Sequence, residues 1–279
     1  MSASIQPPEA STAPGAAPPA DQDHSLALEE RRRRILGLIQ GRAQVTVAEL
    51  AARFAVSAVT IRSDLAALDA VGAILRIHGG AMPRRDSDDV PIDVKQTLHR
   101  AEKVRIATAA TGLIHDGATV ILDSGTTTAE IARQIRGLRL ESINVITNAL
   151  NVAVLLANAP HVNLIMPGGV LRGKSWSLCG PQAENAMRDL QADLLFLGVD
   201  SLDPEIGLMT PHVLEAQLNA QMIRIARQVV AVTDSSKLLR RNLSVIAPVE
   251  VVDILITDRS ADAGCIEAIR ERGVEVRLV

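Results

Sequence analysis

The chain has 279 residues, of which 47% are hydrophobic and 22% charged, with a formal net charge of −3. These values fit one or two globular domains and exclude a wholly disordered chain. Aromatic residues make up only 1% of the sequence, which argues against nucleic-acid recognition by stacked rings. Two distant cysteines make a disulfide framework or a Cys-based zinc site unexpected. Because neither a membrane-spanning run nor a secretory signal is visible, we expect a cytoplasmic protein without a membrane partner.

Charge and composition divide the chain into four segments. Residues 1–27 are rich in Pro, Ala and Ser and predict a disordered tail. Residues 28–82 hold eight Lys and Arg against five Asp and Glu, a small basic module of the kind that binds nucleic acid. Residues 83–94 combine prolines with a charge run and predict a linker. Residues 95–279 alternate helical patterns with short apolar runs and predict an α/β domain with a mostly parallel sheet.

The basic module opens with a predicted helix over residues 28–40, whose leucines and isoleucines fall near one face. The run from Arg31 to Arg34 lies on this helix. It has two interpretations of equal weight, a solvated face or a set of phosphate contacts.

Two further helices are predicted in the module. Thr46 and Glu49 have the spacing of a capping box that opens a helix over residues 47–54. Ser57 is the predicted cap of a second helix, in which Ile61 and Leu65 begin a buried stripe. In residues 74–81, apolar and basic residues alternate and a Gly-Gly pair follows, which predicts a short β-hairpin. The module is therefore predicted to be a winged helix-turn-helix.

In such a module the second helix enters the major groove and its first turn faces the base edges, while the wing lies beside the backbone. The alternative is an ordinary three-helix bundle. The residues predicted to contact DNA are Ser57, Ala58, Thr60, Arg62 and Ser63 on the second helix and Arg76 and His78 on the wing. His78 has no second ligand at useful spacing, so we expect no metal ion there.

The segment VTVAELAARFAVSAVTIRSDLAALDAVGAILRIHGGAM (residues 45–82) resembles the DNA-binding domain of DeoR-family bacterial transcription regulators. The resemblance covers about fifty residues and rests on ELA..F.VS..TIR.DL and R.HGGA. One position departs from the family pattern, because Ser63 follows Arg62 where the family usually has a second arginine. The resemblance thus implies operator binding with one expected contact missing.

The larger domain carries small polar residues where its first strand ends. Strand 118–122 leads into Asp123, Ser124, Gly125 and a run of threonines that opens a helix. Free N–H groups and hydroxyls at a helix N-terminus form an anion site, although a threonine that simply caps the helix is an equally good interpretation. The loop lacks the Walker lysine and the Rossmann glycine pattern, so ATP and NAD are disfavoured and no cofactor is expected.

Polar residues also follow the other predicted strands, which are INVIT, VNLIM, DLLFLGV, VVAVT and DILIT. In open α/β sheets, ligands bind outside the carboxyl ends of the strands near a switch point, so these residues are expected to converge. Asp258 is interpreted as a turn residue only. The predicted effector-binding residues are Asp123, Ser124, Gly125, Thr126, Thr127, Asn148, Gly168, Gly169, Arg172, Asp200 and Lys237.

This half also resembles the DeoR-family effector domain through DG.TVILDSGTTT..IA, VITN, GG.LR, FLGVD, D.SK and ITD. The resemblance implies a Rossmann-like fold similar to sugar-phosphate isomerases and a phosphorylated sugar as effector. It places the phosphate at Ser124–Thr127 with Lys237 assisting, and the sugar at Asp123, Asn148 and Asp200. The stretches SLCGPQAEN and SSKLLRRNLSVIA more narrowly resemble N-acetylgalactosamine-utilisation repressors.

Three other side chains are expected to be structural. His161 and His212 have no clear partner in the sequence, and Trp176 is predicted to fill the core in preference to the pocket rim.

The leading hypothesis is a repressor of a sugar or amino-sugar operon that a phosphorylated sugar releases from DNA. Two or more modules in a homo-oligomer, a dimer or tetramer, would match repeated half-sites. A second hypothesis is an isomerase or deaminase acting on a sugar phosphate, but no convincing set of catalytic residues is visible, so we expect no enzyme. A third is a constitutive DNA binder with a degenerate pocket.

Overall fold

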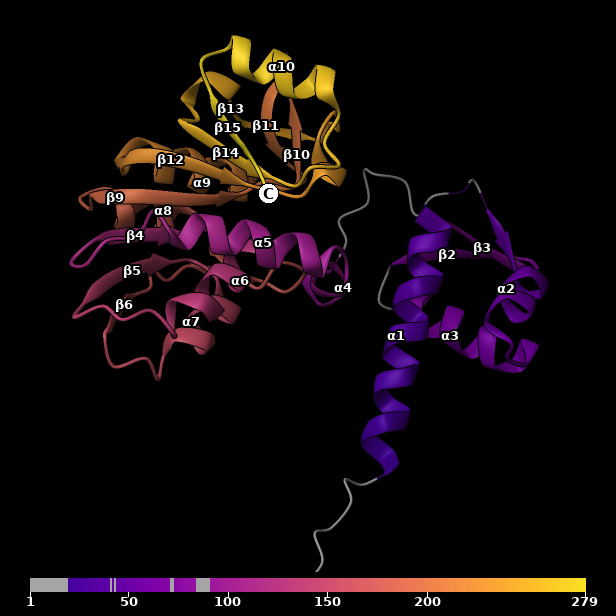
Figure 1. Ribbon diagram of the computed structural model, residues 1–279. Helices are drawn as coiled ribbons and strands as arrows, with labels where there is room; N and C mark the ends of the chain where they lie inside the picture. Colours follow the sequence, from indigo (N-terminus) through magenta and orange to yellow (C-terminus); the bar gives the residue numbers. More distant parts are fainter. Residues whose placement is uncertain (1–19, 41, 43, 71–72, 84–90) are drawn as a thin grey trace, which may run out of the picture.

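A computed structural model describes residues 20–40, 42, 44–70, 73–83 and 91–279. Figure 1 shows a small N-terminal lobe of helices with a wing and a larger lobe built around a central sheet. The predicted fold class, a winged helix-turn-helix followed by a Rossmann-like α/β domain, is confirmed. Among the described residues, no helix is long and apolar enough to span a membrane.

The small lobe is a winged helix. Its elements are α1 (Ala20–Gln40), β1 (Val45–Thr46), α2 (Val47–Phe54), α3 (Ala58–Ala70), β2 (Ile74–Ile77) and β3 (Gly80–Pro83). Helix α1 begins at Ala20, inside the segment predicted to be a tail, while residues 1–19 of that segment lie outside the described residues. Strand β3 pairs antiparallel with both β2 and β1, so the wing is fastened to the residues just before α2.

Local capping sets the starts of α2 and α3, as predicted. Thr46 accepts from the N–H of Glu49, whose carboxylate accepts from the N–H of Thr46, which completes the capping box. Ser57 Oγ accepts from the N–H of Thr60 at 3.0 Å. The predicted stripe is buried, and with Ile35 and Ile39 of α1 it forms the core of the lobe. We call this apolar cluster the winged-helix core.

Between the lobes the structure differs from the prediction. The sequence pattern predicts one helix from Lys95 to His115, whereas the structure divides this stretch into α4 (Ile92–Thr97) and α5 (Arg100–Thr111). The break falls at His99, whose φ of 49° is left-handed and cannot continue a helix. Helix α4 also starts inside the predicted linker, whose residues 84–90 lie outside the described residues.

A seven-stranded sheet forms the centre of the larger lobe, and every pairing within it is parallel. Its order is β15-β14-β12-β9-β4-β5-β6. The strands are β4 (Thr119–Leu122), β5 (Ile143–Thr147), β6 (Val162–Ile165), β9 (Ala192–Gly198), β12 (Ala226–Val232), β14 (Ile254–Thr257) and β15 (Glu275–Leu278). All but β15 coincide with predicted strands, because buried parallel strands leave continuous apolar runs in a sequence.

Helices cover both faces of this sheet (Figure 1). One face packs against α5, α6 (Thr126–Ile135) and α7 (Leu150–Leu156), and the other against α8 (Pro181–Met187), α9 (Val213–Ile225) and α10 (Ala263–Glu271). Alternate residues of each strand point to opposite faces. Along β9, Leu194 and Phe196 belong to the first core, whereas Leu195 and Leu197 belong to the second.

Two small antiparallel sheets were not predicted. One pairs β7 (Val170–Arg172) with β8 (Ser177–Cys179), and the other joins β10 (Ser201–Asp203), β11 (Gly207–Thr210) and β13 (Ser244–Ala247). Short 3-10 turns follow at Ser235–Lys237 and Val249–Val251. In the chain, β7 and β8 follow β6, and β10 and β11 follow β9. The small sheets therefore begin at the carboxyl-end edge of the main sheet, where the polar loops lie.

Candidate functional site

The main sheet changes direction between β4 and β9. From β4 the chain proceeds through β5 and β6 toward one edge, and from β9 through β12, β14 and β15 toward the other. The loops that leave these two central strands therefore turn to opposite faces and leave a crevice between them. A cavity of about 860 Å³ lies there, lined by residues that follow β4, β9 and β12, by α4 and α5, and by four residues of the winged helix.

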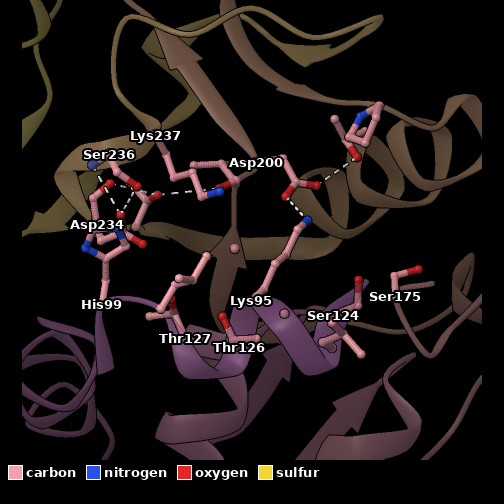
Figure 2. Close-up of a pocket in the computed structure, with 18 of the residues that line it drawn as sticks. Lys95, His99, Ser124, Thr126, Thr127, Ser175, Asp200, Asp234, Ser236 and Lys237 are labelled. Atoms are coloured by element: carbon pink, nitrogen blue, oxygen red, sulfur yellow. Dashed lines mark hydrogen bonds and ion pairs between the residues drawn. The ribbon is translucent and has the colours of Figure 1, made fainter. Parts of the chain in front are cut away.

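The structure brings most of the predicted effector residues to this cavity. Those that line it are Asp123, Ser124, Gly125, Thr126, Thr127, Asp200 and Lys237. Figure 2 shows the loop that starts α6 on one wall, with Asp234, Ser236 and Lys237 on another. The convergence follows from the parallel sheet, because all these residues follow strands whose carboxyl ends meet at one edge.

The N-terminus of α6 opens into the cavity without a side-chain cap. Gly125 occupies the N-cap position and makes no side-chain bond to the first turn. The hydroxyl of Thr128 donates back to the carbonyl of Gly125 at 3.2 Å, so it satisfies an acceptor and leaves the first N–H groups of the helix open. With Gly125, Thr126 and Thr127 on the wall, these donors and the positive end of the helix dipole favour an anion.

A buried lysine, Lys103, and a partly buried one, Lys237, add positive charge to the same cavity. Burial, opposed by the charge of Asp234 and aided by those of Lys237 and Lys95, lowers the pKa of Lys103 to about 8. Burial likewise lowers the pKa of Lys237, against the attraction of Asp200. An anionic ligand would offset this repulsion and desolvation, so the cluster is best matched by a phosphate group.

Asp200 holds the opposite side of the cavity. Its carboxylate pairs with Lys95 of α4 and accepts a 3.4 Å hydrogen bond from the hydroxyl of Thr210. Burial alone would raise the pKa of Asp200, but Lys95 and Lys237 outweigh it and hold the pKa below its usual value. Asp200 is therefore an ionised acceptor, suited to a sugar hydroxyl.

Asp123 is the most deeply buried acid of the site, at 1% exposure. Its carboxylate accepts from the amide of Asn219, on α9, at 3.4 Å. Burial raises the pKa of Asp123 well above its usual value, and the charges of Glu215 and Asp200 add to the rise. A protonated Asp123 can donate as well as accept, which suits a ligand that presents hydroxyl or amide groups.

Arg172 is held at the cavity edge by Glu215. Its guanidinium lies 3.1 Å from one oxygen of Glu215, and the hydroxyls of Ser175 and Ser177 donate to the other at 2.5 and 2.6 Å. Glu215 lines the cavity, whereas Arg172 itself does not. The network fixes the β7–β8 hairpin to α9, so Arg172 stands behind the wall of the site.

Three predicted residues lie away from the cavity wall. Asn148 is completely buried and donates to the carbonyl of Leu178 at 3.3 Å. Gly168 and Gly169 lie in the turn before β7, where a Cβ on Gly169 would meet the carbonyl oxygen of Cys179 at 2.7 Å. These positions shape the hairpin beside the site, and their contact with a ligand stays a prediction.

Four side chains are predicted to have structural tasks, and the structure places three of these residues in structural positions. Asp258 accepts from the N–H groups of Ser235 and Ser260, so it organises a turn as expected. His161 reaches the carbonyl of Ile135 at 3.0 Å, and His212 is the N-cap residue of α9. Trp176 was expected in the core, but it is 38% exposed next to β8, with a φ of 52°. The hairpin turn points the ring outward.

Several other residues line the site but were not among the predicted effector contacts. They are Lys95, Lys103, Thr210, Glu215, Asn219 and Asp234. Most stand on helices or on strands of the small sheets, where a lysine or glutamate looks like an ordinary surface residue. Asp234 lies two residues after the end of β12, so the strand-end rule applied elsewhere could have found it.

The winged helix presents the predicted DNA contacts on its outer side. Arg62, Ser63, Arg76 and His78 are exposed, and Ser57 is also exposed at the start of α3. Ala58 and Thr60 are partly buried. Val59, which was not predicted, is 71% exposed on the first turn of α3. An apolar side chain there can contact a thymine methyl group in the major groove.

The arginine run of α1 is divided between two tasks. Arg31 and Arg32 pair with Asp64 of α3 at 2.7 and 2.9 Å, and Asp64 is only 1% exposed. Arg33 and Arg34 pair along the helix with Glu30. Two of the four arginines therefore neutralise a buried carboxylate, a structural task that neither sequence interpretation included.

The comparisons with known proteins agree with this architecture. Residues 31–85 match the DeoR-like helix-turn-helix domain and residues 98–259 the DeoR C terminal sensor domain. An Escherichia coli O157:H7 protein, named for transcriptional repression of the aga operon, is 42% identical over 90% of this chain and 93% of its own length. The glycerol-3-phosphate regulon repressor of Escherichia coli K12 is 28% identical over 89% of this chain and 98% of its own.

Among solved structures, ribose 5-phosphate isomerase A from Methanocaldococcus jannaschii matches 49% of this chain and 53% of its own, with a TM-score of 0.35 and 20% identity. The two family matches and the 42% identical relative confirm the resemblance seen in the sequence. The chain belongs to the DeoR family of transcriptional regulators.

Proposed function

We propose that this protein represses a sugar or amino-sugar operon and leaves its operator when a phosphorylated sugar binds the switch-point cavity. The observation that carries the proposal is the cavity itself, which is lined by an uncapped helix N-terminus, by Lys103 and Lys237, and by the carboxyl groups of Asp123 and Asp200. One end of the cavity suits a phosphate and the other suits hydroxyl groups.

The residues assigned to the phosphate are Ser124 to Thr127, with Lys237 and Lys103. Those assigned to the sugar are Asp123 and Asp200. The names of two relatives support this class of effector, since one is named for the aga operon and the other for the glycerol-3-phosphate regulon. The relatives named here are transcriptional regulators, which supports regulation over catalysis as the task of the cavity.

On the DNA side, α3 is assigned to the major groove and the wing to the backbone, with Arg62 and Arg76 as the principal cationic contacts. A homo-oligomer is part of the proposal, because two winged helices related by a two-fold axis fit a palindromic operator. Ligand binding releases DNA only through its different affinities for the two arrangements of the protein.

A thermal-shift panel tests the effector. It comprises N-acetylgalactosamine 6-phosphate, galactosamine 6-phosphate, tagatose 6-phosphate and glycerol 3-phosphate, each beside its unphosphorylated parent. We expect one phosphorylated compound, and not its parent, to raise the melting temperature, since a ligand that binds only the native state stabilises it. The same compound should release the operator in a fluorescence anisotropy titration.

Lys237→Met tests the assignment of residues. The variant should bind the active compound at least tenfold more weakly, since it loses a cation near the phosphate, and should bind the operator as the wild type does. Arg227→Met is the matched control, because Arg227 is the second residue of β12 and lies at the end of that strand away from Lys237. Equal effector affinity in the wild type and Lys237→Met would remove Lys237 from the site.

A further inference from the structure

Helix α4 touches both lobes of the protein. Val94 is a buried member of the winged-helix core, and Leu98 packs against the same cluster. The neighbouring Lys95 points the other way, into the cavity, and pairs with Asp200. Consecutive residues of a helix point about 100° apart, so a helix of six residues can have one side chain in each lobe.

Three further contacts tie α4 to the sensor lobe. The N–H of Ile92 donates to the carbonyl of Lys174, in the β7–β8 turn, at 2.8 Å. The ammonium of Lys103 donates to the carbonyls of Lys95 and Leu98 at 2.5 and 2.6 Å, across the break between α4 and α5. Helix α4 is therefore fastened by groups that themselves line the cavity.

We propose that α4 transmits occupancy of the cavity to the winged helix, with the Lys95–Asp200 ion pair as its ligand-sensitive latch. This inference rests on the proposed function, because it describes how ligand binding in that cavity would change DNA binding by the winged helix. Figure 2 shows the two side chains reaching toward one another across the cavity. Figure 1 shows α4 on the side of the sensor lobe that faces the winged helix.

The chemistry of a phosphorylated sugar acts on both partners of the latch. A phosphate attracts the ammonium of Lys95, and a sugar hydroxyl donates to the carboxylate of Asp200. The pair is accessible to such competition, since the two side chains are 23% and 27% exposed. Once Lys95 follows the ligand, its backbone carries Val94 with it, because the two residues are adjacent in one short helix.

The latched arrangement holds the winged helix in place before the ligand arrives. Opening the latch reduces the fraction of protein that can place its winged helices on DNA, and the apparent operator affinity falls in proportion to that fraction. A substitution that breaks the latch should therefore imitate the ligand in its absence. If α4 were only a passive linker, breaking the latch would leave operator affinity unchanged.

The experiment measures operator dissociation constants of the full chain without any ligand. Asp200→Asn and Lys95→Met remove the latch from opposite sides, and each should weaken operator binding at least fivefold. The double variant should be no weaker than the worse single variant, because both substitutions remove the same Lys95–Asp200 ion pair. Asp193→Asn is the matched control, since Asp193 lies at the other end of β9 and bonds only to groups away from α4.

Val94→Ala tests the side of α4 that packs in the winged-helix core and should weaken operator binding in the same way. Thermal unfolding should confirm a folded winged helix in every variant. Operator affinity equal to the wild type in both Asp200→Asn and Lys95→Met would overturn the proposal. Because no sugar phosphate is present, this result is independent of the effector panel. A wild type that ignores every sugar phosphate would instead contradict the proposed function.

Discussion

At the scale of single residues, a buried charge organises the winged helix. Asp64 stands in the core side of α3, where an unpaired carboxylate would be costly. Arg31 and Arg32 reach it from α1 and supply both charge and hydrogen bonds. The aspartate of the TIR.DL pattern is therefore explained by the packing of α1 on α3, while the exposed Arg62 keeps its proposed contact with DNA.

Replacing Asp64 tests this assignment. Asp64→Ala should destabilise the winged helix by about 3 kcal/mol, because it leaves two arginines without their buried partner. Chemical denaturation followed by far-ultraviolet circular dichroism would measure the change. Glu30→Ala is the control, since Glu30 pairs with exposed arginines and should cost less than about 1 kcal/mol. Equal stability of the two variants would contradict the structural task of Asp64.

The exposed arginines have a different expected effect. Arg62→Ala and Arg76→Ala should each weaken operator binding by about 1–3 kcal/mol and leave the unfolding free energy unchanged. If the contact is to phosphate, the slope of log K against log salt should fall by about one unit. Arg270→Ala, on α10 of the sensor lobe, is the control. Unaltered affinity and salt slope in both variants would contradict the assignment of α3 and the wing to DNA.

At the scale of elements, the site depends on where helices begin and end. The chain enters α6 through Gly125, whose lack of a side chain leaves the N–H groups of the first turn to the cavity. It leaves α4 at Leu98, where Lys103 of the next helix satisfies the carbonyls of the last turn. The N-terminus of α6 thus offers N–H donors to a ligand, whereas the C-terminus of α4 accepts hydrogen bonds from the ammonium of Lys103.

The lowered pKa of Lys103 predicts a pH dependence of effector binding. Its pKa of about 8 is that of the free protein, and a bound phosphate would raise it again. The favourable contribution of Lys103 is therefore fully present below about pH 8 and is lost as the pH rises through the pKa of the complex.

Calorimetric titration with the active compound of the panel should show its dissociation constant rising about tenfold from about pH 7.5 to about pH 9.5. The phosphate of the ligand stays a dianion across this range. Lys103→Met should bind more weakly at the lower pH and show a smaller rise. A pH-independent wild type would show that Lys103 does not face the bound anion.

At the scale of the whole molecule, one lobe is a helix-turn-helix domain and the other a sensor domain for which effector binding is proposed, and α4 contacts both. A single winged helix reads only a few base pairs, so operator specificity requires more than one copy. Two copies related by a two-fold axis place their α3 helices in successive major grooves. Oligomerisation is therefore expected to decide affinity as much as any one contact.

An operator with one half-site scrambled tests this expectation. The full chain should bind it at least a hundredfold more weakly than the intact operator, because the second winged helix then makes only non-specific contacts. Fluorescence anisotropy at fixed salt would measure both affinities, and sedimentation velocity would give the oligomer. Equal affinity for both DNAs, with a monomeric protein, would contradict a two-fold complex.

Much of the fold could be predicted because its signals are local. The caps at Thr46 and Ser57, the buried stripe of α3 and six continuous apolar strands are all written within a few neighbouring residues. The small sheets of the larger lobe were missed, since strands such as Val170–Arg172 and Ser201–Asp203 have three residues each and mix apolar with polar side chains. Strand-end residues such as Asp123 and Asp200 were found because parallel strands bring their carboxyl ends together.

The sequence by itself determined the two-lobed architecture, the family and the loop at the start of α6. Only the tertiary structure decided the partners of the charged groups. Asp200 meets Lys95 across 105 residues of chain, and Arg172 meets Glu215 across 43. Such pairs leave no periodic trace, because each depends on where whole elements pack and not on neighbours in the sequence. The charges of the site, and the helix that ties it to the winged helix, therefore became visible only in three dimensions.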